Sequence, residues 1–448
     1  MRRLYDDNLY DFATPQPSYW EATAPPPDFA SPRLERDDTC DVAIIGGGYT
    51  GLSAAYHLAR DYGTDVRVLE AGPIGWGASG RNGGFCCIGG TGLQPRGVIR
   101  HFGLDAARTW YRSQVRAVEL VRSLVREEAI DVDMYGAAEV EMAHSRRAFA
   151  GLESDYRTLT DVLGLDAELL TRYEVRERIH DTAEQHGALI ARPAFGLHPL
   201  RYCRGLALAA SRRGATLHSS SEVLEWSRAG DGAHILHTAG ATLRASRVLF
   251  ATNGFMPERL RGEFYGRTMP IVSAIVVTRP LSDDERLDEG WRTEHPAINS
   301  RRLLNYFRLL PDNRFLFGGR GHTRGTQAGE LATYRKIIST FRRLWPGWAH
   351  VEIEYRWHGL ICMTAPLRPG IGRMTDDPFT YFGFGYHGNG VNTATWAGKQ
   401  LADWIGCGRA PDDLPRFARE LPRRYPVPVL RRAYLRTGLT VANWLDSL

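Results

Sequence analysis

Three glycines and one acid define the first candidate site. Gly46, Gly48 and Gly51 keep a G-x-G-x-x-G spacing directly after the apolar stretch 40–45, and Glu70 follows 19 residues after the third glycine. Such glycines let a pyrophosphate approach the turn between a buried strand and a helix, whose N-terminus then faces the phosphates. An acid after the next strand can accept hydrogen bonds from ribose hydroxyls. The pattern predicts a dinucleotide-binding site.

The elements that must hold this site can be read on either side of the glycines. Residues 40–45 are short, apolar and β-branched, as in a strand covered on both faces. Residues 53–60 continue as a helix, and 65–70 form a second strand that ends at the acid. Because strand, turn, helix, strand and acid agree, the fingerprint is more than an ordinary glycine-rich turn.

A long glycine-rich loop comes next, at residues 71–85, with the sequence AGPIGWGASGRNGGF. Long loops without secondary structure are uncommon inside compact domains and are usually functional. Its glycines remove side chains where the backbone must lie against a flat or bulky group. We therefore expect this loop to contact the same ligand.

Length and composition describe a folded protein of several domains. The chain has 448 residues, of which 43% are hydrophobic, and its net charge of +5 comes from 56 basic and 51 acidic residues spread along the chain. Whole-chain disorder is excluded by this composition. The mild basic excess gives little reason to expect a nucleic-acid partner.

The six cysteines show neither C-x-x-C nor any metal-ligand spacing, so we expect no metal site and reduced thiols in a cytoplasmic protein. The N-terminus lacks the apolar run of a signal peptide. No window reaches about 18 uninterrupted apolar residues, so no integral membrane segment is expected. Nothing in the sequence indicates the oligomeric state.

The two glycine motifs, together with Ser18-Tyr19-Trp20 and the rear glycine run 385–391, resemble the FAD-dependent amine and amino-acid oxidoreductases of the D-amino-acid oxidase and glycine oxidase type. Within that family the chain is most similar to the gamma-glutamylputrescine oxidase-like branch. The resemblance covers about residues 18–405. It implies an α/β fold: a GR2-type FAD-binding Rossmann-like domain with an inserted α+β substrate domain built on a mixed β-sheet. It also favours FAD over a nicotinamide cofactor, which the first fingerprint alone would allow.

The resemblance suggests a discontinuous domain organisation. The expected parts are an extended lead-in (1–39), an FAD-binding domain (40–104, 190–267 and 356–406), a substrate domain (105–189 and 268–355) and a basic helical tail (407–448). Within the substrate domain, the pattern of residues 105–129 predicts a helix with Asp105 as its N-cap.

The resemblance, together with the glycine motifs, implies cofactor contacts from both ends of the chain. The glycine turn and its acid, the loop from residue 79, the return strand that ends at Thr252 and the rear turn would converge on one FAD. The expected cofactor-binding residues are Gly46, Gly48, Tyr49, Thr50, Gly51, Glu70, Ala71, Ser79, Arg81, Asn82, Gly83, Gly84, Val223, Thr252, Gly388, Asn389, Gly390 and Val391. The rear turn leads into a helix whose positive N-terminus can lie beside the pyrimidine edge of the flavin.

Three side chains are candidates for the reacting centre. His387 lies within the rear turn, although it could equally hydrogen-bond only to the backbone or the flavin. Tyr306 and Arg320, with Arg308 beside them, could line the substrate pocket, where a guanidinium would bind a carboxylate through two hydrogen bonds. For any single arginine the alternative is a solvated surface position.

The resemblance implies oxidation of a primary or secondary amine, either a polyamine derivative or an amino acid, to an imine by hydride transfer to FAD, with oxygen as the expected acceptor. The alternatives are a dehydrogenase that passes electrons to a quinone or protein, and a non-catalytic flavin-binding scaffold or redox sensor. The proposed oxidation requires no partner other than the small-molecule amine.

Three departures from the family bear on the chemistry. Neither lysine, Lys336 or Lys399, matches the position that some relatives use for oxygen activation. Cys362 is offset from the cysteine that some relatives attach to FAD, so non-covalent binding is expected. Thr364-Ala365-Pro366 stands where Thr-Pro-Asp is common, which removes a carboxylate. Adjacent Cys86 and Cys87 could form a redox pair or be small buried side chains.

Overall fold

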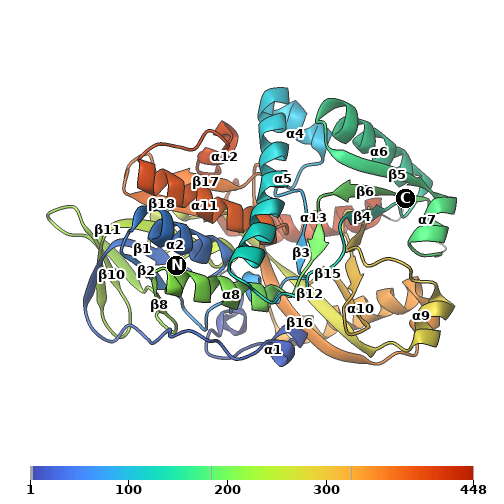
Figure 1. Cartoon of the computed structure of the whole chain (residues 1–448), viewed down its shortest axis with the longest axis horizontal. Coiled ribbons are helices and arrows are strands. Elements are labelled where there is room, and N and C mark those ends of the chain that lie inside the picture. The colour runs from blue at the N-terminus through green and yellow to red at the C-terminus, as the bar shows by residue number, and fades with distance from the viewer. Residues whose placement is uncertain (1–3, 183, 324, 447–448) are drawn as a thin grey trace.

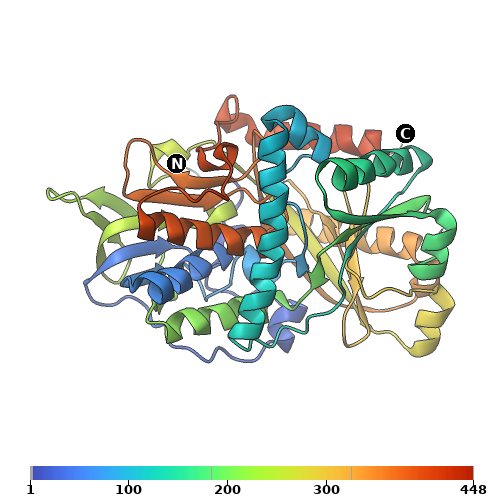
Figure 2. The same ribbon diagram turned by 45° about the horizontal axis from the view of Figure 1, so that its top comes forward.

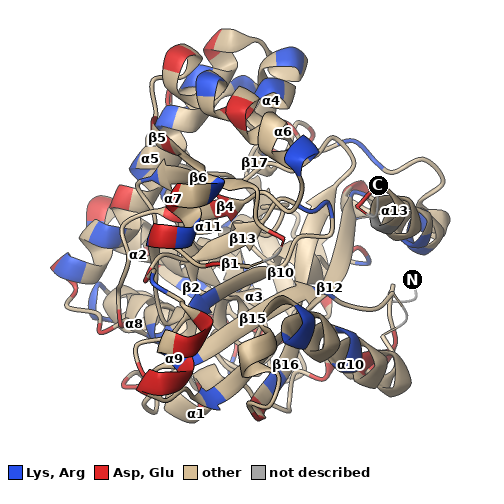
Figure 3. Cartoon of the chain, turned by 90° about the vertical axis from the view of Figure 1, so that its right-hand side faces the viewer, with Lys and Arg blue, Asp and Glu red and all other residues tan. Residues whose placement is uncertain are grey.

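The computed structural model describes residues 4–182, 184–323 and 325–446. Two large β-sheets lie side by side, each with helices packed against it (Figure 1). The long helix α5 (Leu104–Glu127) runs between the two halves, as a second view also shows (Figure 2). Charged residues of both signs are interspersed over the outer face of the second half (Figure 3).

The first sheet carries the predicted dinucleotide fold. Strand β1 (Asp38–Ile45) lies between β2 (Val66–Leu69) and β11 (Thr242–Phe250), all three parallel. Ile45 stands opposite both Leu69 and Phe250, so the three strands end at one edge. The residues that follow each strand therefore meet there, which is where ligands bind in open α/β sheets.

Further strands extend this sheet on both sides. They are β8 (Thr216–His218) beside β2, β18 (Thr380–Phe384) beside β11, β17 (Gly370–Arg373) antiparallel at the edge, and the hairpin β9 (Glu225–Arg228) and β10 (His234–His237), which joins β11. The sequence of residues 215–226 and 234–243 predicts a hairpin region, and the structure divides it between the parallel strand β8 and the antiparallel hairpin of β9 and β10.

Helices α2 (Tyr49–Tyr62), α8 (Pro199–Arg212) and α11 (Val391–Cys407) pack with this sheet. The close approach of α11 to α2 depends on Gly398, because a Cβ there would lie 2.4 Å from the carbonyl oxygen of Thr50. The α11 sequence predicts a small-residue face for close packing, and the structure confirms it.

The second sheet is mixed, as predicted. Its order is β16-β12-β15-β14-β13-β4-β6-β5, and only β13 and β4 run parallel. The strands are β4 (Glu139–Met142), β5 (Asp166–Thr171), β6 (Gly187–Arg192), β12 (Thr268–Pro280), β13 (Ala297–Asn299), β14 (Tyr306–Leu309), β15 (Arg314–Arg320) and β16 (Ile353–Thr364). Aromatic side chains, including Phe307, Phe315 and Trp345, form a core between this sheet and α10 (Gln327–Leu344).

Shorter elements complete the chain. The helices are α3 (Ala78–Arg81), α4 (Pro95–Phe102), α6 (Arg146–Arg157), α7 (Arg172–Arg178), α9 (Asp283–Glu289) and α12 (Arg416–Arg419), and β3 (Phe85–Cys86) pairs with β7 (Phe195–Gly196). One capping prediction was wrong: α5 takes Gly103 as its N-cap, with Asp105 inside the first turn. There its carboxylate still complements the helix dipole.

The two ends of the chain pack onto the body. The lead-in is not extended throughout, because it forms the short helix α1 (Tyr19–Thr23), where Trp20 is buried and donates a hydrogen bond from its indole nitrogen to the Asn82 carbonyl. In the tail, α13 (Arg431–Leu445) packs Leu435 against Met269 and Ile271 of β12. Within the described ranges, no helix has the length and apolar character needed to span a membrane.

The strand pairing bears on the domain boundaries. β16 pairs with β12 along its whole length, although residues from 356 onward were assigned to the FAD-binding domain. β6 likewise crosses the boundary expected at residue 190. We propose the discontinuous two-domain division with β6 and β16 placed in the domain of the second sheet.

Candidate cofactor and substrate site

One cavity of about 1000 Å³ runs from the strand ends of the first sheet to the face of the second. Its walls come from the glycine turn after β1, the end of β2, the loop around α3, the end of β11, the turn before α11, and β4, β12, β14, β15 and β16. Segments from both ends of the sequence therefore line one cavity.

The glycine turn presents bare backbone to this cavity. Gly46 has a φ of +113°, and a Cβ at Gly51 would lie 2.0 Å from the Gly46 carbonyl oxygen. A Cβ at Gly48 would lie 2.7 Å from the Ser79 hydroxyl, which accepts a hydrogen bond from the Tyr49 backbone N–H. The turn is thus closely packed behind and open in front, as a phosphate site at a helix N-terminus requires.

Glu70 is held at the end of β2 by the same turn. Its carboxylate accepts hydrogen bonds from the backbone N–H groups of Gly47 at 2.6 Å and Gly72 at 3.2 Å. Burial raises the pKa of Glu70, while these bonds favour its ionised form. Ala71 and Val223 line the cavity beside it.

The loop around α3 is fastened by Asn82. The side-chain amide donates to the carbonyls of Ala78 and Ser79, both at 3.0 Å, and its oxygen accepts the Gly84 N–H at 2.7 Å. Arg81 lies 3.8 Å over the Trp76 ring, and burial lowers the pKa of this guanidinium to about 10. One of its terminal nitrogens has no partner among the described residues, so it remains available to a ligand.

The rear turn brings unsatisfied donors to the cavity. Gly388 has a φ of +99°, His387 has a φ of +55°, and α11 begins at Val391 without a side-chain cap. The first N–H groups of a helix have no partner within the helix. Asn389 fixes the turn by donating to the Cys87 carbonyl at 2.9 Å. The turn therefore suits an electron-rich ligand edge, for which the helix N-terminus provides positive potential.

His387 lies in this turn with a defined tautomer. Thr364 donates its hydroxyl proton to the Arg368 carbonyl, so the same oxygen accepts the Nε2–H of His387 at 3.4 Å. Nδ1 then carries the lone pair, lies against Gly92 and has no partner among the described residues. Burial lowers the pKa of His387 to about 4. The imidazole is accordingly neutral near pH 7.

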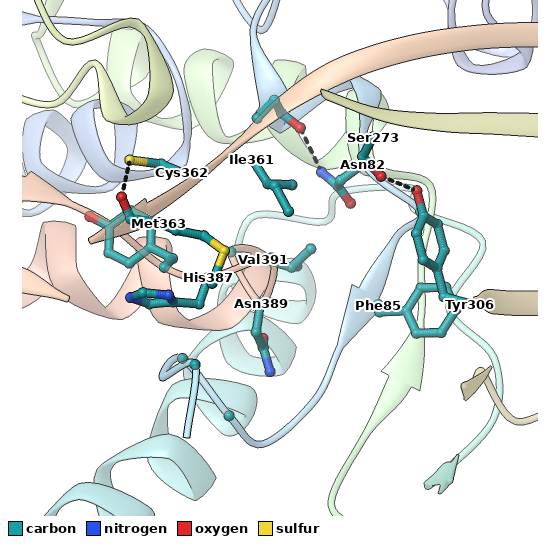
Figure 4. Close-up of a pocket in the computed structure, with 18 of the residues that line it drawn as sticks. Asn82, Phe85, Ser273, Tyr306, Ile361, Cys362, Met363, His387, Asn389 and Val391 are labelled. Carbon is teal, nitrogen blue, oxygen red and sulfur yellow. Dashed lines mark hydrogen bonds between the residues drawn. The ribbon is translucent and has the colours of Figure 1, made fainter. Parts of the chain in front are cut away.

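Tyr306 and Arg320 face the cavity from the second sheet. The Tyr306 hydroxyl shares a hydrogen bond of 2.9 Å with Ser273, and burial raises its pKa to about 12. Burial lowers the pKa of Arg320, and no described carboxylate lies within 4.0 Å of its nitrogens. Figure 4 shows Tyr306 and Phe85 on one side of the pocket and His387 and Cys362 on the other.

The structure brings most of the expected residues together. His387, Tyr306 and Arg320 line the cavity, as do Gly46, Gly48, Tyr49, Thr50, Glu70, Ala71, Ser79, Arg81, Asn82, Gly83, Val223, Thr252, Gly388, Asn389, Gly390 and Val391. Gly51 and Gly84 do not line it, and both instead permit close backbone packing.

Arg308 does not belong to this group. It is fully buried two residues beyond Tyr306 on β14, where it donates to the Leu197 carbonyl at 2.7 Å and lies over the rings of Trp20 and Tyr135. The suggestion that Arg308 lines the substrate pocket was therefore wrong. Residues on the same strand face can differ in function because they lie under different neighbours.

Several cavity residues were missed by the sequence reasoning. Phe12 of the lead-in packs its ring 4.8 Å from Trp76, and both line the cavity. Glu139 and Glu141 of β4 also line it, together with Tyr111 of α5. An alternating pattern of acid and apolar residues at 139–142 was visible in the sequence, but on its own it reads as one solvated strand face.

The thiols and lysines give little sign of special reactivity. Cys362 lines the cavity, and burial raises its pKa to about 12. Cys86 and Cys87 are both buried, and burial raises each pKa well above its usual value, which disfavours the reactive thiolate. Neither lysine lines the cavity, and Lys399 pairs with Asp403 at 2.6 Å.

Known proteins resemble this chain over most of its length. The family model described as "FAD dependent oxidoreductase" matches residues 41–404. Gamma-glutamylputrescine oxidoreductase of Escherichia coli (strain K12) is 31% identical, over 93% of this chain and 95% of that protein. A probable oxidoreductase, OrdL, of Rhizobium meliloti (strain 1021) is 33% identical over 87% of this chain and 88% of its own length.

Solved structures share the fold. Glycine oxidase from Geobacillus kaustophilus superposes with a TM-score of 0.69 at 21% identity, covering 87% of this chain and all of that one. L-proline dehydrogenase from P. horikoshii gives the same TM-score at 19% identity, covering 90% and 99%. With its glycine turn, its two sheets and the family match over residues 41–404, this chain belongs to the FAD-dependent oxidoreductase family.

Proposed function

We propose that the chain binds FAD non-covalently and oxidises a primary or secondary amine, or an amino acid, to an imine. The observation that carries this proposal is the single cavity, which joins a dinucleotide turn, an uncapped helix N-terminus and an unpaired guanidinium. The relatives named for gamma-glutamylputrescine and glycine support an amine as the substrate class.

The residues present fit FAD. Glu70 and Val223 would hold the adenosine end, and the Gly46 to Gly51 turn with Ser79 would hold the pyrophosphate. The N–H groups at the start of α11 would face the pyrimidine edge of the ring. The raised pKa of Cys362 supports non-covalent binding, because attachment through sulfur needs a thiolate.

When bound, FAD would supply the two-electron acceptor for the carbon beside the substrate nitrogen. Arg320 would orient a substrate carboxylate by a charge-assisted pair, and Tyr306, whose hydroxyl donates to Ser273, would line the pocket beside it. His387 would keep the rear turn in place, because its backbone N–H donates to the Cys362 carbonyl and its ring Nε2–H donates to the Thr364 hydroxyl oxygen. The buried Nδ1 makes positioning a better role for it than proton transfer from substrate.

Oxygen is the proposed electron acceptor, with a quinone or protein acceptor as the second candidate. The second candidate is favoured by one observation: neither lysine of the chain lines the cavity to offer a cationic side chain beside the ring. The anaerobic experiment below therefore includes a reoxidation step.

The test is anaerobic mixing of the holoenzyme with a panel of amines that includes gamma-glutamylputrescine, sarcosine and cyclic amino acids. We expect at least one amine to bleach the visible flavin absorbance, followed by reoxidation on mixing with oxygen as fast as turnover. Bleaching with slow reoxidation would select the dehydrogenase. A flavin that no amine reduces would leave a scaffold or sensor and contradict the proposed enzyme.

A further inference from the structure

A segment of the lead-in, residues 5–20, lies against the cavity and contacts both halves of the molecule. We name it the strap. It comes before residue 41, where the match to the family model begins, and the proposed oxidation gives it no role. It contains the 3-10 helix η1 (Asp7–Tyr10) and ends in the first turn of α1.

The first anchor of the strap lies on the second sheet. The Tyr5 hydroxyl donates to the Pro270 carbonyl of β12 at 2.6 Å. Tyr5 and Leu9 are each only 4% exposed, and both pack in one cluster with Val272 of β12 and Leu360 of β16. Neither Tyr5 nor Leu9 lines the cavity. This anchor therefore holds the strap without a contact of its own to a bound cofactor.

The second anchor lies on the loop around α3. Trp20 is 1% exposed, and its indole N–H donates to the Asn82 carbonyl of that loop at 2.9 Å. In the opposite direction, Trp76 of the loop donates its indole N–H to the Thr14 carbonyl of the strap at 3.0 Å. Since Asn82 and Trp76 both line the cavity, the strap is fastened to a wall of the proposed cofactor site.

Phe12 lies between the two anchors and lines the cavity. Its ring meets Trp76 at 4.8 Å and Phe255 at 6.0 Å between centroids, both in edge-to-face arrangements. Its carbonyl oxygen would lie 2.8 Å from a Cβ at Gly72, whose N–H donates to the Glu70 carboxylate at 3.2 Å. One residue thus separates Phe12 from the acid proposed to hold the adenosine end.

These contacts place an aromatic side chain at the nucleotide end of the cavity, on a segment that is held at both of its ends. Aromatic and apolar walls are what buries most of a ligand's surface in binding pockets. A segment that lies across a site must move before a ligand can pass, so its anchors control the rates of entry and release.

We propose that the strap covers the nucleotide half of bound FAD, with Phe12 against the cofactor, and that FAD enters and leaves only when the strap lifts. This inference rests on the FAD binding of the proposed function and is independent of the substrate.

The first test loosens the strap at a distance from the cavity. Rates of FAD binding and release are measured by flavin fluorescence on the full-length wild type and on L9A. We expect both rates to rise by about tenfold or more in L9A, because the buried anchor is weakened. The dissociation constant should change less than either rate. Faster release without faster binding would mean a damaged site and would overturn the lifting of the strap.

The second test removes the ring that faces the cavity. F12A should release FAD about tenfold or more faster than the wild type, the range for losing the contact of a large apolar side chain. F12Y keeps the ring and should release FAD at the wild-type rate. The matched control is N8A, because Asn8 is exposed on the same segment and does not line the cavity.

Thermal unfolding of each FAD-free variant shows whether it is folded, and L9V and F12L serve if L9A or F12A is not. Wild-type rates of FAD binding and release in the folded variants would overturn the inference, whether or not an amine reduces the flavin. Altered rates together with a flavin that no amine reduces would support the strap while the amine oxidation fails. A folded wild type that takes up no FAD would overturn both.

Discussion

At the residue scale, charged side chains of both signs line the cavity. Arg320 is a half-buried cation with no described carboxylate within 4.0 Å, and Glu139 and Glu141 are half-buried carboxyl groups with no described cation within 4.0 Å. Each is costly to hold in a low-dielectric site unless something of opposite charge arrives. We expect a substrate that carries a carboxylate to bind with that group toward Arg320.

Replacing Arg320 should affect only substrates that carry a carboxylate. We expect R320M to raise KM for an amino-acid substrate by roughly tenfold to a hundredfold, as for the loss of a charge-assisted hydrogen bond. An amine without a carboxylate should keep its KM. The control is R335M, because Arg335 is exposed on α10. Equal KM values for R320M and the wild type would remove Arg320 from the site.

The two glutamates should make the stability of the FAD-free protein depend on pH. The pKa of each rises from an ordinary value of 4.5, to about 7 for Glu139 and about 8 for Glu141. Between pH 4.5 and 8 the unfolded chain loses these protons before the folded one does, so the glutamates lower stability as the pH rises.

The variant E139Q/E141Q lacks this pH dependence, so comparison with the wild type separates the effect of the two glutamates from that of the other titrating groups. The variant should match the wild type near pH 4.5 and exceed it above pH 8 by at least roughly 1 kcal/mol, a figure discounted for water in the cavity. Denaturant unfolding at several pH values measures the difference. A difference that does not grow with pH would show that the pKa values of the two carboxyl groups are not raised in the folded protein.

At the scale of elements, the site depends on how closely α2 approaches β1. A Cβ at Gly51 would lie 2.0 Å from the Gly46 carbonyl oxygen, which is backbone and cannot move aside without opening the turn. G51A should therefore weaken FAD binding sharply and lower stability by roughly 1–3 kcal/mol, the usual cost of overpacking.

G438A is the matched control for G51A. A Cβ at Gly438, within helix α13, would meet nothing within 4 Å, so alanine there should leave FAD binding unchanged and add up to roughly 1 kcal/mol to stability. FAD fluorescence titration and thermal unfolding measure both effects. If G51A binds FAD as the wild type does, the close turn is not needed for the site.

Local sequence patterns predicted the elements whose structure depends on the spacing of neighbouring residues. The glycine turn, β1, β2 and α11 could be predicted because their spacing alone specifies strand, turn and helix. The position of Glu139 and Glu141 in the cavity wall could not be predicted, since it depends on how β4 packs against the rest of the chain, which residues 139–142 do not encode on their own. Arg308 and Arg320 show the same limit. Both lie in or beside predicted strands, but only the packing of the folded chain shows that Arg308 is a buried structural residue and that Arg320 lines the cavity.

At the scale of the whole molecule, the site is assembled from segments far apart in sequence. The glycine turn near residue 46, the end of β11 near residue 252 and the turn before α11 near residue 388 belong to one sheet and its helices, whereas Tyr306 and Arg320 belong to the other sheet. A ligand that contacts all of them would therefore hold the two halves together.

FAD should accordingly stabilise the whole chain. At a free concentration one hundred times its dissociation constant, one bound FAD adds about 2.7 kcal/mol to the free energy of unfolding. We expect a higher melting temperature and slower proteolysis of both halves in the presence of FAD. Protection confined to the half that contains the first sheet would mean that the second sheet does not contact the cofactor or depend on it.

The most direct measurement is a crystal structure of the FAD-bound enzyme. The account predicts one FAD in the cavity, with its ribose at Glu70, its pyrophosphate at the Gly46 to Gly51 turn, and the pyrimidine edge of its ring within hydrogen-bond distance of the first N–H groups of α11. A flavin ring bound away from the turn at Gly388 to Val391, or a folded protein that takes up no FAD, would contradict it.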